Sequence, residues 1–335
     1  MSTITDVAAL AGVSPSTASR ALRGSGQISA ATRARVEEAA RELDYVANPS
    51  AVRLVNGRTD AIGLVVPFVT RWFFAQAVTG AEDVIRGADH DLLLYNLGGP
   101  DGRQRFFERM PLRNHVAGVL VLSLALSEKE RAQLAQMRVP LVTVGHDAPG
   151  ASSVMIDDRA AASTAVQHLL NLGHRRIGLI GGLPEDPMHF TSSALRARGY
   201  REALTAAGAP VDETLIVPSD YTIDGGRRAA VRLLALPTPP TAVFAMSDEM
   251  AIGAIDAARS MGVRVPEDLS IVGFDDHDLA AFFHLTTIRQ PVQEEGREAA
   301  RILLRMLSAP DEAETAHAVL DTELILRAST APLRR

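Results

Sequence analysis

The sequence contains no cysteine, which excludes disulfide bonds and thiolate metal sites. Aromatic residues are scarce and Lys129 is the only lysine, so arginine carries almost all of the positive charge. No run of eighteen apolar residues occurs, which argues against a membrane-spanning helix. No charged and then apolar leader opens the chain, and we therefore expect a cytoplasmic protein without membrane contact.

Motifs of several large enzyme classes are also absent. The sequence has no P-loop, no His-Glu-x-x-His segment and no Gly-x-Ser-x-Gly segment. The glycines of residues 178–182 lack the Gly-x-Gly-x-x-Gly spacing of a dinucleotide site. The nine histidines are scattered. We therefore expect no catalytic residue, no metal and no cofactor, and an α/β enzyme acting on a sugar or nucleotide is the least favoured hypothesis.

Charge is distributed unevenly along the 335 residues. The first 59 residues carry seven arginines and five acidic residues, whereas the remaining 276 carry 27 basic and 35 acidic residues. With 47% hydrophobic residues, the long second part has ample material for a large core. Nucleic-acid binding is therefore possible only through the mildly basic head, and we expect it to be sensitive to salt and to need two heads.

The head carries the signals of three helices. Thr3 and Asp6 have the spacing of a capping box, and Gly12 suits the left-handed end of a first helix. Ser29 can cap a longer third helix that runs to about Leu43. The apolar stripe expected for the first helix consists of Val7, Leu10 and Ala11.

The second helix has the properties of a recognition helix. Ser14 can cap it and Pro15 suits its first position. The side expected to be buried consists of Ala18, Ala21 and Leu22. The side expected to face outward consists of Pro15, Ser16, Ser19 and Arg20. Two short helices about three residues apart match the docking geometry of a helix-turn-helix in the major groove. The alternative is a small helical bundle without a DNA role.

A short linker helix is predicted next. Asn48 can cap it, Pro49 can start it and Gly57 can end it, which leaves only about two turns. Because helix nucleation is costly, a helix of this length is marginal alone. We therefore expect it to be ordered only against a partner.

These residues resemble the LacI/GalR (lac-repressor) family over essentially the whole chain. The resemblance is carried by Thr-Ile-x-Asp-Val-Ala, Gly-Val-Ser-x-x-Thr-x-Ser-Arg, Asn-Pro-x-Ala and Leu-x-x-Gly-Arg-Thr, all within residues 3–59. It implies that the second helix reads the major groove and that the paired linker ("hinge") helices of a dimer insert leucines into the minor groove.

The resemblance implies specific DNA contacts. Arg20 could reach a guanine edge with two hydrogen bonds, and Leu54 would act as the wedge that kinks the duplex. Pro15 departs from a polar reader, because it can contact bases only through apolar atoms. The full set of implied DNA-contacting residues is Thr3, Ser14, Pro15, Ser16, Thr17, Ser19, Arg20, Asn48, Ala51 and Leu54.

The body alternates β-rich apolar runs with amphipathic stretches, which predicts parallel sheets covered on both faces. The predicted strands are 61–67, 91–95, 118–123, 141–145, 153–156, 177–181, 215–217, 242–246, 270–274 and 322–326. Runs beginning at Ile62, Gly118 and Val142 resemble, in order, runs beginning at Ile177, Ala242 and Ile271. We infer two similar open α/β lobes in tandem, and the family resemblance implies that they are of the periplasmic-binding-protein-like type.

The expected domain plan follows from these runs. A helix-turn-helix domain spans residues 1–46, a hinge spans 47–59, and an effector-binding and dimerisation domain spans 60–335. Within the last, lobe 1 comprises about 60–159 and 291–320, and lobe 2 about 160–290 and 321–330.

Ligands of open parallel sheets bind outside the carboxyl ends of the strands. Polar and aromatic residues that follow the strands are therefore candidates, and the resemblance implies ligand contacts for several of them. The predicted effector-binding residues are Trp72, Phe73, Asp157, Ser192, Arg196, Tyr221, Asp248 and Asp275. Alternatives remain, because the aromatic residues can be core and Asp157 with Asp158 can simply cap a helix.

The leading hypothesis is a dimeric repressor that binds a pseudo-palindromic operator and is released by a small-molecule effector, most simply a sugar. A single recognition helix reads few base pairs, which favours a two-fold dimer. No leucine heptad tail is present, which argues against a tetramer. The alternatives are a repressor that needs a nucleobase or phosphorylated corepressor and a solute-binding protein.

Overall fold

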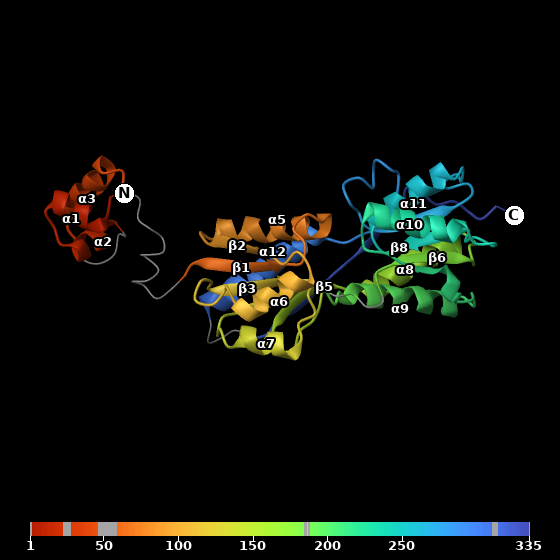
Figure 1. Cartoon of the computed structure of the whole chain (residues 1–335), viewed down its shortest axis with the longest axis horizontal. Coiled ribbons are helices and arrows are strands. Elements are labelled where there is room, and N and C mark those ends of the chain that lie inside the picture. The colour runs from red at the N-terminus through yellow and green to blue at the C-terminus, as the bar shows by residue number, and fades with distance from the viewer. Residues whose placement is uncertain are drawn as a thin grey trace. The chain divides into compact units, whose positions relative to one another are not determined.

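The computed structural model describes residues 2–22, 28–45, 59–183, 186, 188–309 and 314–334. The chain divides into two compact units, residues 1–59 and 60–335 (Figure 1). The predicted hinge helix, with Asn48, Ala51 and Leu54, lies outside the described residues. Within the described ranges, no helix is both long and apolar enough to cross a bilayer.

The described residues of unit 1 form three helices, α1 (Ile4–Ala11), α2 (Pro15–Leu22) and α3 (Ala30–Glu42). The predicted capping box is confirmed: the Asp6 amide donates to Thr3 Oγ1 at 3.3 Å, and the Thr3 amide donates to Asp6 Oδ2 at 2.8 Å. Ser14 Oγ accepts from the Thr17 amide at 3.1 Å and so caps α2. Ser29 Oγ likewise accepts from the Thr32 amide at 3.2 Å and caps α3. These caps explain why the three helices begin where the sequence predicts.

The core of unit 1 is built from small side chains. The buried residues are Val7, Ala8, Ala11, Ala18, Ala21, Val36, Ala39 and Ala40. The prediction that Leu10 belongs to the buried stripe is wrong, since Leu10 is 48% exposed. Helix α1 packs against both α2 and α3. Its inner face is therefore turned towards Ala8, away from Leu10.

Lobe 1 of unit 2 is built on a six-stranded parallel sheet in the order β11-β5-β4-β3-β1-β2. Its strands are β1 (Ala61–Val66), β2 (Asp91–Asn96), β3 (Gly118–Leu122), β4 (Leu141–Val144), β5 (Ser152–Ile156) and β11 (His317–Leu320). Its helices are α5 (Trp72–Gly87), α6 (Pro100–Arg109), α7 (Glu128–Ala135) and α12 (Val292–Ser308). Apolar clusters cover both faces of the sheet.

Lobe 2 has a second six-stranded sheet in the order β12-β10-β9-β8-β6-β7. Its strands are β6 (Ile177–Gly181), β7 (Ile216–Pro218), β8 (Ala242–Ala245), β9 (Ser270–Asp275), β10 (Thr286–Arg289) and β12 (Glu323–Ile325). Its helices are α8 (Asp158–Asn171), α9 (Thr191–Ala206), α10 (Ile223–Leu234) and α11 (Asp248–Ser260), with a 3₁₀ turn η1 (Glu213–Leu215) before β7. Among the described strands of this sheet, β12 alone is antiparallel to its neighbour.

The strand orders of the two sheets correspond one to one, which confirms the predicted pair of open α/β lobes. The three sequence matches fall on β1 and β6, on β3 and β8, and on β4 and β9. Strands β10 and β11 were not predicted. Strand β10 is Thr-Thr-Ile-Arg, and β11 alternates exposed with half-buried residues, so neither reads as an apolar run.

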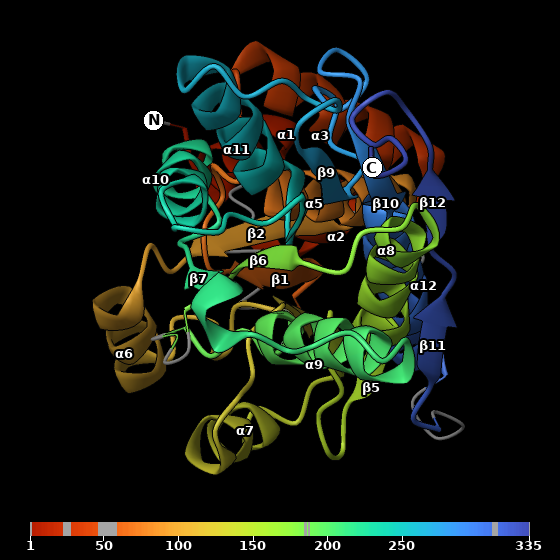
Figure 2. The same ribbon diagram turned by 90° about the vertical axis from the view of Figure 1, so that its right-hand side faces the viewer.

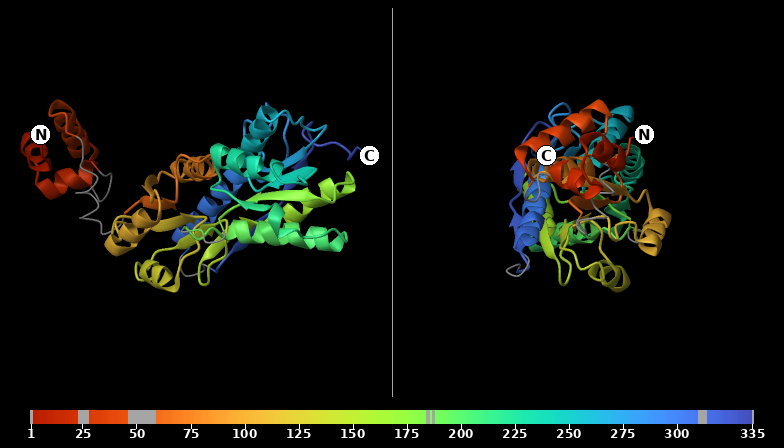
Figure 3. Two further views of the ribbon diagram at one scale, coloured as in Figure 1. Left: turned by 45° about the vertical axis from the view of Figure 1, so that its right-hand side comes forward. Right: turned by 90° about the vertical axis from the view of Figure 1, so that its left-hand side faces the viewer.

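The chain passes between the lobes three times: between β5 and α8, between β10 and α12, and between β11 and β12. The last two strands therefore occupy the terminal positions of the two sheets, where Figure 2 shows them at one side. In Figure 3 the blue C-terminal part of the chain contributes to both lobes. Each lobe is consequently assembled from separate stretches of sequence.

Helices α5 and α12 pack closely although they are far apart in sequence (Figure 1). A Cβ on Gly80 would lie 1.9 Å from the Gln293 carbonyl oxygen, and one on Gly296 would lie 2.1 Å from the Ala77 carbonyl oxygen. Glycine is therefore needed on both helices for this approach.

Candidate functional site

A cavity lies among the strand ends of the two lobes. Its lining residues are Arg71, Trp72, Phe73, Phe74, Ser123, Gly145, Ile156, Asp158, Phe190, Ser192, Arg196, Tyr221, Ser247, Glu249, Asp275, Gln290 and Glu295. Six of the eight predicted effector-binding residues are among them.

An aromatic wall begins at the first turn of α5. Trp72 is held in place from lobe 2, because its Nε1 donates to Asp278 Oδ2 at 3.0 Å and its ring lies 5.0 Å from that of His277. The rings of Phe73 and Phe74 meet edge to face at 5.3 Å. Flat apolar rings of this kind can pack against the apolar face of a sugar or a base.

Arg196 of α9 is buried beneath the opposite wall. Its Nε donates to Asp158 Oδ1 at 2.7 Å, and its Nη1 donates to the Met246 carbonyl at 2.6 Å and lies 4.0 Å from Asp275 Oδ1. The guanidinium also lies 3.6 Å from the centre of the Phe274 ring. Arg196 is thus a fixed charge that orients two carboxylates at the cavity.

Asp275 ends β9 and is almost fully buried. The Gln290 side chain donates to its Oδ1. Burial raises the pKa of Asp275 to about 7, although Arg196 and the Gln290 hydrogen bond act in the opposite direction. At neutral pH this carboxyl can therefore accept hydrogen bonds or, when protonated, donate one.

Tyr221 and Ser192 complete the predicted lining. Tyr221 shares a 2.6 Å hydrogen bond with Ser193 through its hydroxyl, and burial raises its pKa. Its backbone is held at a φ of +58°, which is uncommon for a side-chain-bearing residue. The ring is thereby fixed as a wall of the cavity, beside Ser192 at the start of α9.

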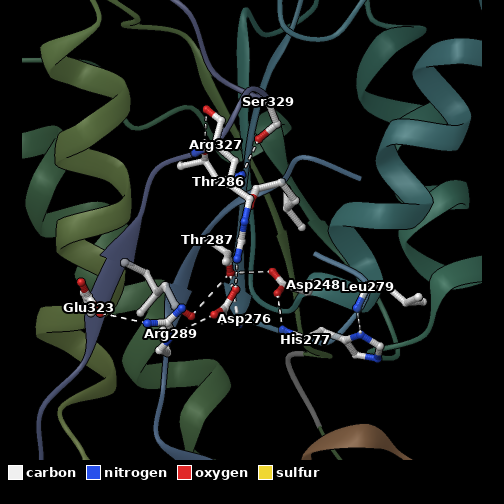
Figure 4. A network of polar contacts seen from close by, with 12 residues as sticks. Asp248, Asp276, His277, Leu279, Thr286, Thr287, Arg289, Glu323, Arg327 and Ser329 are labelled. Carbon is white, nitrogen blue, oxygen red and sulfur yellow. Dashed lines mark hydrogen bonds and ion pairs between the residues drawn. The ribbon is translucent and has the colours of Figure 1, made fainter. Parts of the chain in front are cut away.

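Two predicted residues lie elsewhere. Asp157 is exposed and caps α8, because its Oδ1 accepts from the Ala160 amide at 2.9 Å. Asp248 is fully buried and accepts from Thr287 Oγ1 at 2.7 Å and from the His277 amide at 2.8 Å (Figure 4). Both carboxylates therefore have structural hydrogen bonds, and neither lines the cavity.

Seven polar residues that line the cavity are missing from the predicted set: Arg71, Ser123, Asp158, Ser247, Glu249, Gln290 and Glu295. Asp158 and Glu249 each stand one position after a predicted residue, so the sequence located the right turn but the wrong side chain. Gln290 and Glu295 follow β10, which was not predicted. The sequence repeat between the lobes could have revealed β10, because β10 occupies in lobe 2 the position that the predicted strand β5 occupies in lobe 1.

In unit 1 the α2 side chains predicted to contact DNA lie mostly outward. Ser14, Pro15, Ser16 and Arg20 are exposed, and Arg20 Nε donates to the Ser16 carbonyl at 3.2 Å. Thr17 and Ser19 are half-buried. Thr3 is exposed, but its hydroxyl is engaged with Asp6.

No group of three or more potential ligands that could hold a metal ion occurs in the described part of the chain. What the arrangement provides is a polar and aromatic cavity in unit 2 and an exposed polar helix face in unit 1. Neither contains a nucleophile paired with a base.

Comparison with known proteins places both units. Residues 3–48 match bacterial regulatory proteins of the lacI family, and residues 166–330 match the periplasmic binding protein-like domain. The chain is 37% identical to the HTH-type transcriptional repressor CytR of Escherichia coli (strain K12), over 99% of this chain and 97% of that protein.

Two solved structures are similar over 98% of the chain. A transcriptional regulator CelR–cellobiose complex is 36% identical with a TM-score of 0.73, all of that chain being covered. A lac repressor dimer bound to operator and the anti-inducer ONPF is 26% identical with a TM-score of 0.86, 99% of that chain being covered. The chain therefore belongs to the lacI family of bacterial regulatory proteins.

Proposed function

We propose that this protein is a transcriptional repressor that binds a pseudo-palindromic operator as a dimer and is released when a sugar occupies the cavity of unit 2. The observation that carries the proposal is the combination, in one chain, of an exposed α2 face and a cavity with aromatic and hydrogen-bonding walls. A repressor of this kind works on chromosomal DNA, in the cytoplasm.

The chemistry of the cavity favours a hydroxyl-rich effector. Aromatic residues cover one wall, and carboxyls with Gln290 supply hydrogen-bond acceptors on others. The similar CelR structure is a complex with cellobiose. A phosphorylated effector fits less well, because Arg196 already has Asp158 and a backbone carbonyl as partners, and Arg71 donates to the carbonyls of Asp220 and Tyr221.

Operator recognition is assigned to α2. Arg20 is its only cationic side chain, and the neighbouring Ser16 and Pro15 are exposed with it. One such helix reads only a few base pairs, so two copies related by a two-fold axis are needed for a specific site. The lac repressor structure is a dimer on its operator.

Selection of random duplex DNA by the purified protein, followed by sequencing, tests the proposal. The expected product is an inverted repeat with a flexible central step, and a sugar that binds the protein should lower its affinity for that repeat. Failure to enrich any sequence, with and without candidate ligands and at low salt, would contradict the assignment as a sequence-specific repressor. Tighter DNA binding with the sugar would reverse the direction of the response.

Arg20→Ala tests the recognition face within the selected operator. Loss of a bidentate base contact costs about 1–3 kcal/mol, so affinity should fall about 5- to 150-fold and base preference should relax at one position of each half-site. Arg41→Ala is the matched control, because Arg41 lies on α3 in an exposed ion pair with Glu38. Equal affinities of the two variants would show that α2 does not read bases.

A further inference from the structure

Glu295, in the first turn of α12, is a buried acid that its surroundings do not satisfy. It is 1% exposed and lines the cavity, and its Oε1 has no hydrogen-bond partner among the described residues. A buried carboxyl without a partner is destabilising, because it has lost its water without gaining a donor. Its position at the cavity indicates that the missing donor comes from the bound molecule.

None of the donor groups in the lining is hydrogen-bonded to Glu295 Oε1. Asp158 from α8, Asp275 from β9 and Glu249 from α11 are also carboxyls, so four acids face the same cavity. The two cations among the lining residues are Arg71 and Arg196, and both donate to protein atoms. The four acids, Glu295 included, therefore cannot all be ionised without a further positive charge.

The pKa values agree with this geometry. Burial raises the pKa of Glu295 to about 8, and the charges of Asp158 and Asp275 act in the same direction against that of Arg196. Burial also raises the pKa of Glu249. The cavity thus resists holding all of its acids in the ionised form unless a further cation enters.

We propose that the effector carries a protonated amine that binds Glu295, so that its class is an amino sugar or a similar amine-bearing polyol. The proposal rests on the proposed function, because it names the ligand of the same cavity. An ammonium group has three donors and a positive charge, which match an unpartnered carboxyl among acids. A hydroxyl could donate a hydrogen bond to Glu295 but would bring no positive charge to stabilise its ionised form, and a phosphate would bring a negative charge.

Titration calorimetry on the full chain at pH 7 tests the proposal with matched sugars. The pairs are glucosamine with glucose, galactosamine with galactose and mannosamine with mannose, and glucose 6-phosphate is included as an anion. At least one amine is expected to bind ten or more times more tightly than its hydroxyl counterpart. Equal or weaker binding by every amine, or binding by none of them, would overturn the proposal.

A pair of variants assigns the preference to one side chain. Glu295→Gln keeps the shape and removes the charge, and it should abolish the preference for the amine. Glu294→Gln is the matched control, because Glu294 is on the same helical turn but is half exposed and pairs with Arg301 and Arg297. A preference that survives Glu295→Gln would also overturn the proposal.

Operator affinity of the same preparations separates this proposal from the proposed function. A protein that binds its operator and binds a neutral sugar as tightly as the amine remains a repressor, and only the amine proposal fails. A protein that binds amino sugars but no operator would fail the proposed function while the ligand assignment stands. Thermal unfolding of each variant verifies that the fold is kept.

Discussion

The two lobes share one topology but line the cavity with different chemistry. Lobe 1 contributes the aromatic residues at the start of α5, whereas lobe 2 contributes the Arg196–Asp158 pair, Asp275 and Tyr221. Lobe 1 adds only one buried acid, Glu295. The shared strand order positions the ends of the strands, and the residues that follow each strand determine what is recognised.

The two lobes also differ in where they place a buried ion pair. Each lobe buries an arginine against a carboxylate: Arg196 with Asp158 in lobe 2, and Arg103 with Glu130 in lobe 1. The first pair lines the cavity, whereas the second joins α6 to α7 away from it. Pairs of comparable burial therefore lie at the cavity in one lobe and between two helices in the other.

Replacing the two arginines should cause the largest losses of stability, and it should distinguish the two ion pairs most clearly. Arg196→Ala and Arg103→Ala each leave a carboxylate unpaired, so each should lower the free energy of unfolding by about 3–5 kcal/mol in chemical denaturation. Only Arg196→Ala should also reduce effector affinity, by at least a hundredfold in calorimetry. Equal losses of affinity in both variants would mean that Arg196 acts only through folding.

Adding a Cβ at a close contact between two helices should lower the stability of both lobes by a similar amount. Gly296→Ala places a Cβ against the Ala77 carbonyl in the α5–α12 contact, and Gly253→Ala places one 1.9 Å from the Ile223 carbonyl in the α10–α11 contact. Each change should destabilise by about 3 kcal/mol, since neither backbone can yield cheaply. A variant that unfolds at the wild-type denaturant concentration would show that its helix pair can separate without cost.

The pH dependence of the free energy of unfolding should reveal the titration of Glu295, the buried acid of lobe 1. An acid with a raised pKa binds its proton in the folded state, so stability falls as pH rises towards that pKa. With Glu295 at about 8, ligand-free wild type should lose about 2 kcal/mol between pH 6.5 and 8.5, and Asp275, at about 7, adds a smaller part. His146, whose pKa burial lowers to about 4, stays neutral throughout.

Glu295→Gln should remove most of that loss, and Glu294→Gln should retain it. Chemical denaturation of the three proteins at both pH values gives the measurement. Parallel behaviour of Glu295→Gln and wild type would show that Glu295 is not the titrating group.

Tyr221→Phe should give the smallest effect. It removes the hydroxyl that shares a hydrogen bond with Ser193 but keeps the ring. The expected cost is about 1 kcal/mol of stability, with effector affinity changed less than tenfold, as measured by denaturation and calorimetry. A complete loss of affinity would mean that the hydroxyl, rather than the ring, contacts the effector.

Much of the fold could be predicted from local signals. The Thr3–Asp6 capping box and the apolar runs at β1, β6, β8 and β9 act within a few residues, so they can be recognised without knowledge of the partners. Strand β10 could not be recognised in this way, because its polar threonines are buried by contacts with Asp248 and the segment at Arg327.

The candidate site was predicted less sharply, because the direction of a side chain depends on tertiary packing. Asp157 and Asp158 are adjacent, yet one caps α8 from outside and the other reaches Arg196. Asp248 follows a strand as a ligand would, yet its carboxylate is held by Thr287 and His277. The sequence defines the turn, whereas the neighbours of that turn decide which side chain faces the cavity.

The three passages of the chain between the lobes have a consequence for inheritance. Neither lobe is encoded by one uninterrupted stretch, since α12 and β11 return to lobe 1 after lobe 2 has been nearly completed. A single recombination within the gene can therefore exchange unit 1 with another protein, but it cannot exchange one lobe alone. The two walls of the cavity are inherited together, and new ligand preferences have to arise by substitution at the strand ends.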